Sequence, residues 1–182
     1  MKFEKYFKNY NKSIFDLLNN FDTSLIEKSV SIIDKCKKNN ATVYIVGNGG
    51  SSSIASHVSV DFTKVANIPS VTFNNSNLIT CFANDYGHDN WITEAIKAYL
   101  KKNDILILIS SSGNSENIVN AANHCNNYNI PLITLSGFSE DNLLSKLGNV
   151  NIHIKSKNYN FIEMSHHIIL LSIVDIFSNK II

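Results

Sequence analysis

In the first half of the chain, the side chains best suited to chemistry are His57 and Asp61, which follow a run of glycines and serines at residues 47–53. Their spacing of i and i+4 places both on one face of a helix. An imidazole beside a carboxylate can carry protons or bind a divalent metal ion of the zinc type. We therefore treat His57 and Asp61 as candidate catalytic residues and as candidate metal ligands.

The run at 47–53, Gly-Asn-Gly-Gly-Ser-Ser-Ser, has the features of an anion-binding loop. Residues 41–46 before it are rich in β-branched and aromatic side chains, which predicts a buried strand. Apolar side chains recur at helical spacing after it, and we expect one of the serines 51–53 to cap that helix. Unpaired N–H groups and the helix dipole would both attract an anion to this turn.

A dinucleotide-binding fingerprint is the sharper alternative for this loop, and the sequence argues against it. The fingerprint needs a third glycine, but the corresponding residue is Ser52. The next predicted strand, 70–73, runs into Asn74 and Asn75, which leaves no acidic residue to hold a ribose. We therefore expect no nucleotide cofactor. The simpler alternative to an anion-binding loop at 47–53 is a tight turn between strand and helix.

A second small-residue loop, 110–115, reads Ser-Ser-Ser-Gly-Asn-Ser and also follows an apolar strand and precedes a helix. Four hydroxyls without any charge suit a phosphate monoester held by hydroxyls and backbone N–H groups. All 16 basic residues of the chain are lysines, so no guanidinium is available to grip a phosphate. The simpler alternative is a hydrophilic turn, but two such loops favour phosphate binding.

A third candidate cluster lies near the start of the last predicted helix, where Glu163 is followed by His166 and His167. These side chains lie within reach of one helix face and, with His57 and Asp61, would make a metal site of the zinc type. The alternative for Glu163 is structural, because Asn160-x-x-Glu163 is also the spacing of a helix capping box.

The elements that must position these loops alternate between strands and helices, which predicts a parallel sheet covered on both faces. Two helices at residues 1–40 precede the sheet, the second opened by a Ser24–Glu27 capping box. The α/β core spans 41–182, and nothing divides the chain, so we expect a single domain. Strands are expected at 41–46, 70–73, 104–109, 131–135 and 150–154.

Composition excludes several classes of protein. A formal charge of +1 gives no electrostatic case for nucleic acid or an anionic membrane. The longest apolar run, 168–174, is too short to span a bilayer, and the charged first residues do not resemble a signal peptide. Three widely spaced cysteines suggest buried thiols in a reducing compartment. We therefore expect a cytoplasmic protein whose partner is a small molecule.

Three motifs in order resemble the sugar isomerase (SIS) domain family, and within it the phosphoheptose isomerases. They are the glycine loop 47–51, the segment 83–87 (Ala-Asn-Asp-Tyr-Gly) and the serine loop 109–115. The resemblance implies a flavodoxin-like three-layer fold and a homotetramer with active sites between subunits. It also implies that the residues contacting the phosphorylated sugar are Asn48, Gly49, Gly50, Ser51, Asn84, Asp85, Ser110, Ser111, Ser112, Ser115 and Glu163.

The chain departs from the family pattern at the reactive groups. Asp61 stands where the family has a glutamate, and Glu163 where it has a glutamine. The second family histidine is replaced by Leu171, and a family arginine by Val65. We assign Asp61 as general base, His57 as metal ligand or proton partner, and Glu163 with either His166 or His167 as the replacement for the missing histidine.

Two functions follow from the resemblance. The first is an aldose–ketose isomerase of heptose biosynthesis that converts sedoheptulose 7-phosphate to D-glycero-D-manno-heptose 7-phosphate through an enediol, with a possible zinc ion. The second is a non-catalytic SIS protein, either a phosphosugar-binding regulator or a replication-initiator-associating protein. The retained carboxylates favour the isomerase, whereas the missing second histidine keeps the alternative open.

Overall fold

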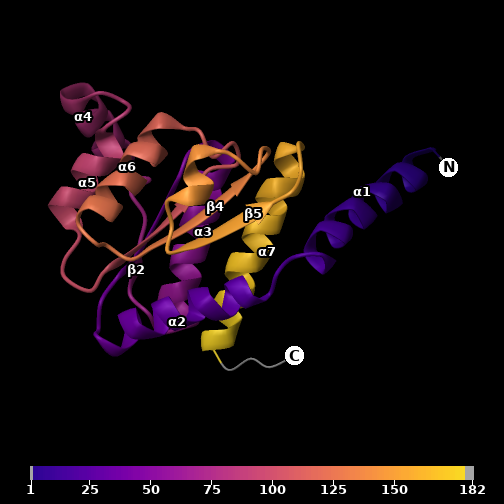
Figure 1. Cartoon of the computed structure of the whole chain (residues 1–182), viewed down its shortest axis with the longest axis horizontal. Helices are drawn as coiled ribbons and strands as arrows, with labels where there is room; N and C mark the ends of the chain where they lie inside the picture. The colour runs from indigo at the N-terminus through magenta and orange to yellow at the C-terminus, as the bar shows by residue number, and fades with distance from the viewer. Residues whose placement is uncertain (1, 179–182) are drawn as a thin grey trace.

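The structure is a computed structural model that describes residues 2–178 of the chain. Its centre is a parallel five-stranded sheet in the order β2-β1-β3-β4-β5, with helices on both faces (Figure 1). This is the three-layer α/β architecture that the sequence predicts. The strands are β1 (Val43–Gly47), β2 (Ser70–Val71), β3 (Ile105–Ile109), β4 (Leu132–Gly137) and β5 (Val150–Ile154). The α-helices are α1 (Lys2–Asn19), α2 (Ser24–Lys38), α3 (Gly49–Lys64), α4 (Ser76–Tyr86), α5 (Trp91–Tyr99), α6 (Glu116–Asn127) and α7 (Tyr159–Phe177).

Strand register brings the two small-residue loops together. β1 and β3 are parallel neighbours, and their last residues, Gly47 and Ile109, are directly paired. The glycine loop leaves β1 and the serine loop leaves β3 at this point, so both loops lie at the carboxyl edge of the sheet. Ligands of open α/β sheets bind at this edge.

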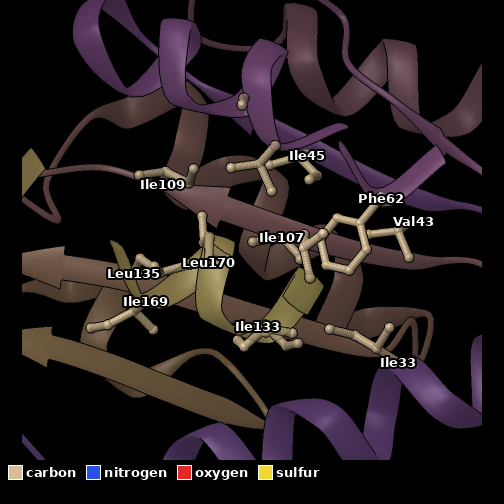
Figure 2. Packing of buried hydrophobic residues seen from close by; sticks show 14 of the residues in the cluster. Ile33, Val43, Ile45, Phe62, Ile107, Ile109, Ile133, Leu135, Ile169 and Leu170 are labelled. Carbon is tan, nitrogen blue, oxygen red and sulfur yellow. The ribbon is translucent and has the colours of Figure 1, made fainter. Parts of the chain in front are cut away.

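Two apolar layers hold the helices onto the sheet. The first packs α2, α3 and α7 against one face, with Ile33, Phe62 and Leu170 all fully buried (Figure 2). The second packs α4, α5 and α6 against the other face. Complete burial of a side chain such as Phe62 or Leu170 contributes roughly 1.5–3 kcal/mol. The two layers therefore fix the orientations of α3 and α7, which carry the candidate reactive groups.

The N-terminal helix α1 projects from the body of the molecule (Figure 1) and buries no residue. Its exposed side chains include Phe3, Tyr6, Phe7 and Phe15. Its attachment to α7 includes an edge-to-face contact between Tyr10 and Phe161, with ring centroids 4.8 Å apart. An aromatic surface of this kind is typical of a protein–protein contact.

By length and composition, α7 is long and apolar enough to cross a membrane. It is the only such helix within residues 2–178. In the structure it lies against the sheet, where Ile162, Ile169, Leu170 and Ile173 are buried in the core. It is therefore the core helix of an α/β layer.

Three local expectations were wrong. No capping box joins Ser24 and Glu27, because α2 is preceded by Thr23 and has no side-chain cap. β2 covers only Ser70–Val71 and ends before Phe73, whose side chain packs in the second apolar layer. Cys81 is exposed, whereas Cys36 and Cys125 are buried as expected.

Candidate active site

A cavity of about 260 Å³ lies where the two loops meet at the carboxyl edge of the sheet. Its walls come from β3, from both loops and from the first turns of α3 and α7. It is lined by Asn48, Gly49, Gly50, Ser51, Ile109, Ser110, Ser111, Ser112, Ser115, Tyr159 and Glu163. All four serines assigned to phosphate binding, and all four residues assigned in the glycine loop, therefore share one cavity.

The serine loop presents its hydroxyls to this cavity. The Oγ atom of Ser110 lies 3.2 Å from the Oγ of Ser115 and 3.5 Å from that of Ser112. The Oγ of Ser111 is buried and has no hydrogen-bond partner. Leaving a buried hydroxyl unpaired costs about 1–3 kcal/mol, a cost that a bound ligand oxygen would remove if it reached this atom.

The helix after the glycine loop begins earlier than expected. Its N-cap residue is Asn48, and Gly49 with a φ of +54° is the first helical residue, so Ser51 lies inside the helix. A positive φ is accessible to glycine at little cost. The expectation that one of the serines 51–53 caps this helix is therefore wrong.

Two helix N-termini reach the cavity without a side-chain cap. Neither Asn48, the N-cap of α3, nor Ser115, the N-cap of α6, accepts a hydrogen bond from its own helix. The first-turn N–H groups of a helix have no partner within the helix, and the dipole makes this end positive. The cavity can therefore hold an anion even though no lysine lines it.

The Asn48 side chain is bound elsewhere. Its Nδ2 donates to Oδ1 of Asn117 at 2.9 Å, and Nδ2 of Asn117 donates back to Oδ1 of Asn48 at 3.1 Å. This reciprocal pair joins the glycine loop to the helix that follows the serine loop. Asn117 was not predicted from the sequence, where its signal was a polar residue on the face of α6 that buries Ile118, Ala121 and Cys125.

Glu163 is the one carboxylate that lines the cavity. It lies against Gly50 of α3, where a Cβ atom would come within 2.6 Å of its Oε1. A side chain at residue 50 would therefore displace this carboxylate from its position. Asn158 caps α7 by accepting hydrogen bonds from the N–H groups of Asn160 and Phe161, so the proposed Asn160–Glu163 capping box is wrong.

His57, Asp61 and His167 form a chain of contacts between α3 and α7. His57 Nδ1 lies 3.0 Å from His167 Nε2, and His57 Nε2 lies 3.3 Å from Asp61 Oδ2. With the Nε2 proton on each ring, His167 donates to His57 and His57 donates to Asp61. Burial, and to a smaller extent the neighbouring His57, lowers the pKa of His167. The lowered pKa favours the neutral form of this ring.

Of the two histidines left open by the sequence, His167 is therefore the one beside His57. His166 is fully buried, and its Nε2 lies 3.0 Å from the carbonyl oxygen of Ser136 on β4. Burial lowers the pKa of His166 to about 4. The prediction that His166 is a catalytic residue is not supported by this position, because its ring faces the sheet and does not line the cavity.

Asn84 and Asp85 lie near the C-terminal end of α4, outside the cavity lining. The Nδ2 of Asn84 donates to Oδ1 of Asp85 at 2.9 Å, and both residues are exposed. Their assignment to the sugar site, which came from the resemblance, stays a prediction.

The residues of one chain do not form a recognisable metal site. Within residues 2–178, no three His, Cys, Asp or Glu side chains are arranged to hold a metal ion. Both ring nitrogens of His57 are already in contact with Asp61 or His167. The zinc site expected from His57, Asp61, Glu163 and His167 therefore stays a prediction, and this arrangement does not fit it without rearrangement of the rings.

Comparison with known proteins identifies the family. The family described as the SIS domain matches residues 5–137 of this chain. The chain belongs to the SIS domain family. The phosphoheptose isomerase of Colwellia psychrerythraea is 31% identical over 159 residues, which cover 83% of this chain and 81% of that protein. The phosphoheptose isomerase of Cytophaga hutchinsonii is 31% identical over 139 residues, which cover 74% of this chain and 72% of that protein. The resemblance expected from the three motifs is thus confirmed.

Solved structures agree with this membership. A phosphoheptose isomerase from Francisella tularensis matches with a TM-score of 0.84 and 26% identity, over 98% of this chain and 97% of that one. The phosphoheptose isomerase from Neisseria gonorrhoeae matches with a TM-score of 0.86 at 19% identity, over 96% of this chain and 99% of that one. The fold of this SIS-domain chain is therefore that of the phosphoheptose isomerases over nearly its whole length.

Proposed function

We propose that the protein is an isomerase of phosphorylated sugars that converts sedoheptulose 7-phosphate to D-glycero-D-manno-heptose 7-phosphate. The observation that carries the proposal is the shared cavity of the two loops, where serine hydroxyls and uncapped helix N-termini lie beside one carboxylate. The phosphoheptose isomerases that match over most of the chain name the substrate class.

The phosphate is expected to bind at the serine loop. Ser110, Ser111, Ser112 and Ser115 supply hydroxyls, and the first turn of α6 supplies N–H groups and the positive end of a dipole. Because no lysine lines the cavity, these groups carry the charge recognition in one chain. Fixing the phosphate leaves the sugar chain to extend toward α3 and α7.

The chemical step moves hydrogen between C1 and C2. A base removes a proton from C1 of the ketose, the electron pair forms the C1–C2 double bond, and the C2 oxygen takes a proton to give the enediol. The base then returns its proton to C2, while the C1 hydroxyl loses a proton to give the aldehyde. No proton is gained or lost overall, so one carboxylate and one oxygen-directed proton carrier suffice.

Glu163 is the base that we favour in one chain, since it is the carboxylate that lines the cavity. Asp61, which the sequence favoured, lies about three turns beyond Gly50, roughly 16 Å along α3. We propose that Asp61 orients His57, and that His57 and His167 move protons between sugar oxygens. The lowered pKa of His167 favours the neutral ring, in which one nitrogen can accept a proton while the other donates one.

We further propose that the chain assembles as a homotetramer and that Asp61, His57 and His167 complete a site shared between subunits. The side chain of His57 is 53% exposed on the outer face of α3 and α7. Three apolar side chains on the same two helices are also exposed, namely Val60 on α3 and Met164 and Ile168 on α7. A second copy covering this face would bury these groups and bring the histidines to a neighbouring cavity.

The test is turnover of sedoheptulose 7-phosphate by the purified protein, compared with a panel of C5 to C7 sugar phosphates. Selective isomerisation of the seven-carbon substrate supports the proposal. Binding of a sugar phosphate without turnover of any member of the panel would favour the non-catalytic regulator instead. Metal analysis of the same preparation decides whether zinc accompanies the active protein, because a bound ion would appear in stoichiometric amount.

A further inference from the structure

Asn48 is the N-cap residue of α3, but its side chain does not act as a cap. Its backbone angles, φ −107° and ψ 150°, are those from which an asparagine side chain normally accepts a hydrogen bond from its helix. Asn158 has nearly the same angles, φ −103° and ψ 118°, and caps α7 in this way. The backbone of Asn48 therefore permits a cap that the structure does not contain.

Asn117 accounts for the difference. It lies in the first turn of α6, is only 1% exposed, and exchanges two hydrogen bonds with Asn48 at 2.9 and 3.1 Å. Both the carbonyl and the amino group of the Asn48 side chain are engaged by this pair. The contact joins residues that are 69 positions apart in the chain.

We propose that Asn117 is a positioning residue, which holds the Asn48 side chain away from the N-terminus of α3 and so keeps the N–H groups of Gly50 and Ser51 available to the substrate. These are the N–H groups that an N-cap side chain binds at the second and third helical positions. A second, independent observation is that Ser111, which lines the same cavity, has a buried Oγ without a hydrogen-bond partner. The proposal rests on the proposed function, because it takes the ligand to be a sugar phosphate.

Loss of the Asn117 side chain would release Asn48 to cap its own helix. The Oδ1 of Asn48 would then occupy the N–H groups of α3 and compete with the oxygens of the ligand. Substrate affinity would fall, whereas the reacting groups on α7 would stay in place. The KM should therefore change far more than kcat.

A double-mutant cycle on Asn48 and Asn117 separates this role from simple packing. Turnover of sedoheptulose 7-phosphate and calorimetric binding of inorganic phosphate are measured for the wild type, Asn117→Ala, Asn48→Ala and the double variant. We expect Asn117→Ala to raise KM about tenfold with kcat within about twofold of the wild type. In the Asn48→Ala background, where no side chain can cap α3, the same change should alter KM less than about twofold.

Equal effects of Asn117→Ala in both backgrounds would overturn the proposal, because packing alone would then explain them. Asn117→Ser, which retains a small polar group, provides a second variant if Asn117→Ala folds poorly. Asn151→Ala is the matched control, since Asn151 also binds through its side chain, to Thr134 and Gly148, but does not line the cavity. It should lower the melting temperature and leave KM unchanged.

The design also separates the two proposals. A wild type that binds inorganic phosphate but does not turn over the heptose phosphate contradicts the proposed function, and the cycle is then read from the phosphate dissociation constants. A wild type that turns over the substrate, with equal effects in both backgrounds, contradicts the role of Asn117 alone. A wild type that neither turns over the heptose phosphate nor binds phosphate overturns both.

Discussion

Helices of this protein begin in two different ways. α4 and α7 are closed by Asn75 and Asn158, whose side chains each accept two hydrogen bonds from their own helix. α3 and α6 begin with Asn48 and Ser115, residues equally able to cap, but neither of these side chains does so. Both of these N-termini line the same cavity, whereas α2 and α5, whose N-cap residues Thr23 and Asn90 also form no side-chain cap, begin outside it. The contrast shows that an absent cap marks a candidate binding site only where the helix N-terminus also lines a cavity.

The largest effect on turnover is expected at Glu163. This residue belongs to the capped helix α7 but lies beside the uncapped N-terminus of α3. Glu163→Gln keeps the shape of the side chain and removes the base. We expect kcat to fall on the order of a hundredfold or more, with little change in phosphate affinity. Steady-state kinetics and phosphate calorimetry measure both quantities. Normal turnover by this variant would place the base elsewhere, with Asp61→Asn as the next variant to examine.

The second effect concerns the serine loop at the N-terminus of α6. Changing Ser110 and Ser115 together to Ala removes two hydroxyls from a cavity that no lysine lines. Each lost hydrogen bond to a charged group is worth about 1.5–3 kcal/mol, so we expect KM to rise about a hundredfold or more. Unchanged affinity for the phosphorylated sugar in the double variant would remove the loop from the phosphate site.

A third prediction concerns His166, which lies on the buried side of α7, away from the cavity. Burial in the folded state lowers the pKa of His166 to about 4, below its ordinary value of 6.5. The unfolded chain therefore binds more protons between these values, and stability falls as the pH drops from 6.5 toward 4. Urea unfolding across this range should show a loss on the order of 3 kcal/mol. A His166→Gln variant should lose most of this pH dependence, and an unchanged slope would assign it to other groups.

The smallest effect compares a true cap with an unused one. Asn75→Ala removes the side-chain cap of α4 and should cost about 1 kcal/mol of unfolding free energy. Ser115→Ala removes no capping bond from α6 and should cost clearly less, while weakening ligand binding. Chemical unfolding of the two variants without ligand gives the comparison. A larger loss for Ser115→Ala would mean that its hydroxyl stabilises the apo protein.

Much of the architecture could be predicted, because strand and helix patterns depend on local periodicity. The buried runs 43–47 and 105–109 became neighbouring parallel strands, and the loops after them share a cavity as expected. Glu163 lines the same cavity and lies against Gly50, a contact that the sequence did not show, and its assigned role stays a prediction.

The details that sequence missed depend on contacts between distant segments. Sequence spacing could not choose between His166 and His167, because the choice depends on how α7 is rotated against α3 and β4. The capping assignments at Ser24 and at the serines 51–53 were wrong, since a local motif does not show where a side chain finds a better partner. Asn117 was missed for the same reason, because its partner lies in another loop.

The most direct test of the account is an NMR titration of the assigned backbone amides with sedoheptulose 7-phosphate. We expect large shifts for the N–H groups of Gly50 and Ser51 at α3 and of Asn117 at α6. Little change is expected for Asn77 and Leu78, which the side chain of Asn75 already binds. Saturable shifts confined to the N-termini of α3 and α6 would support the proposed site. Binding that leaves those amides unshifted, or shifts α4 equally, would contradict it.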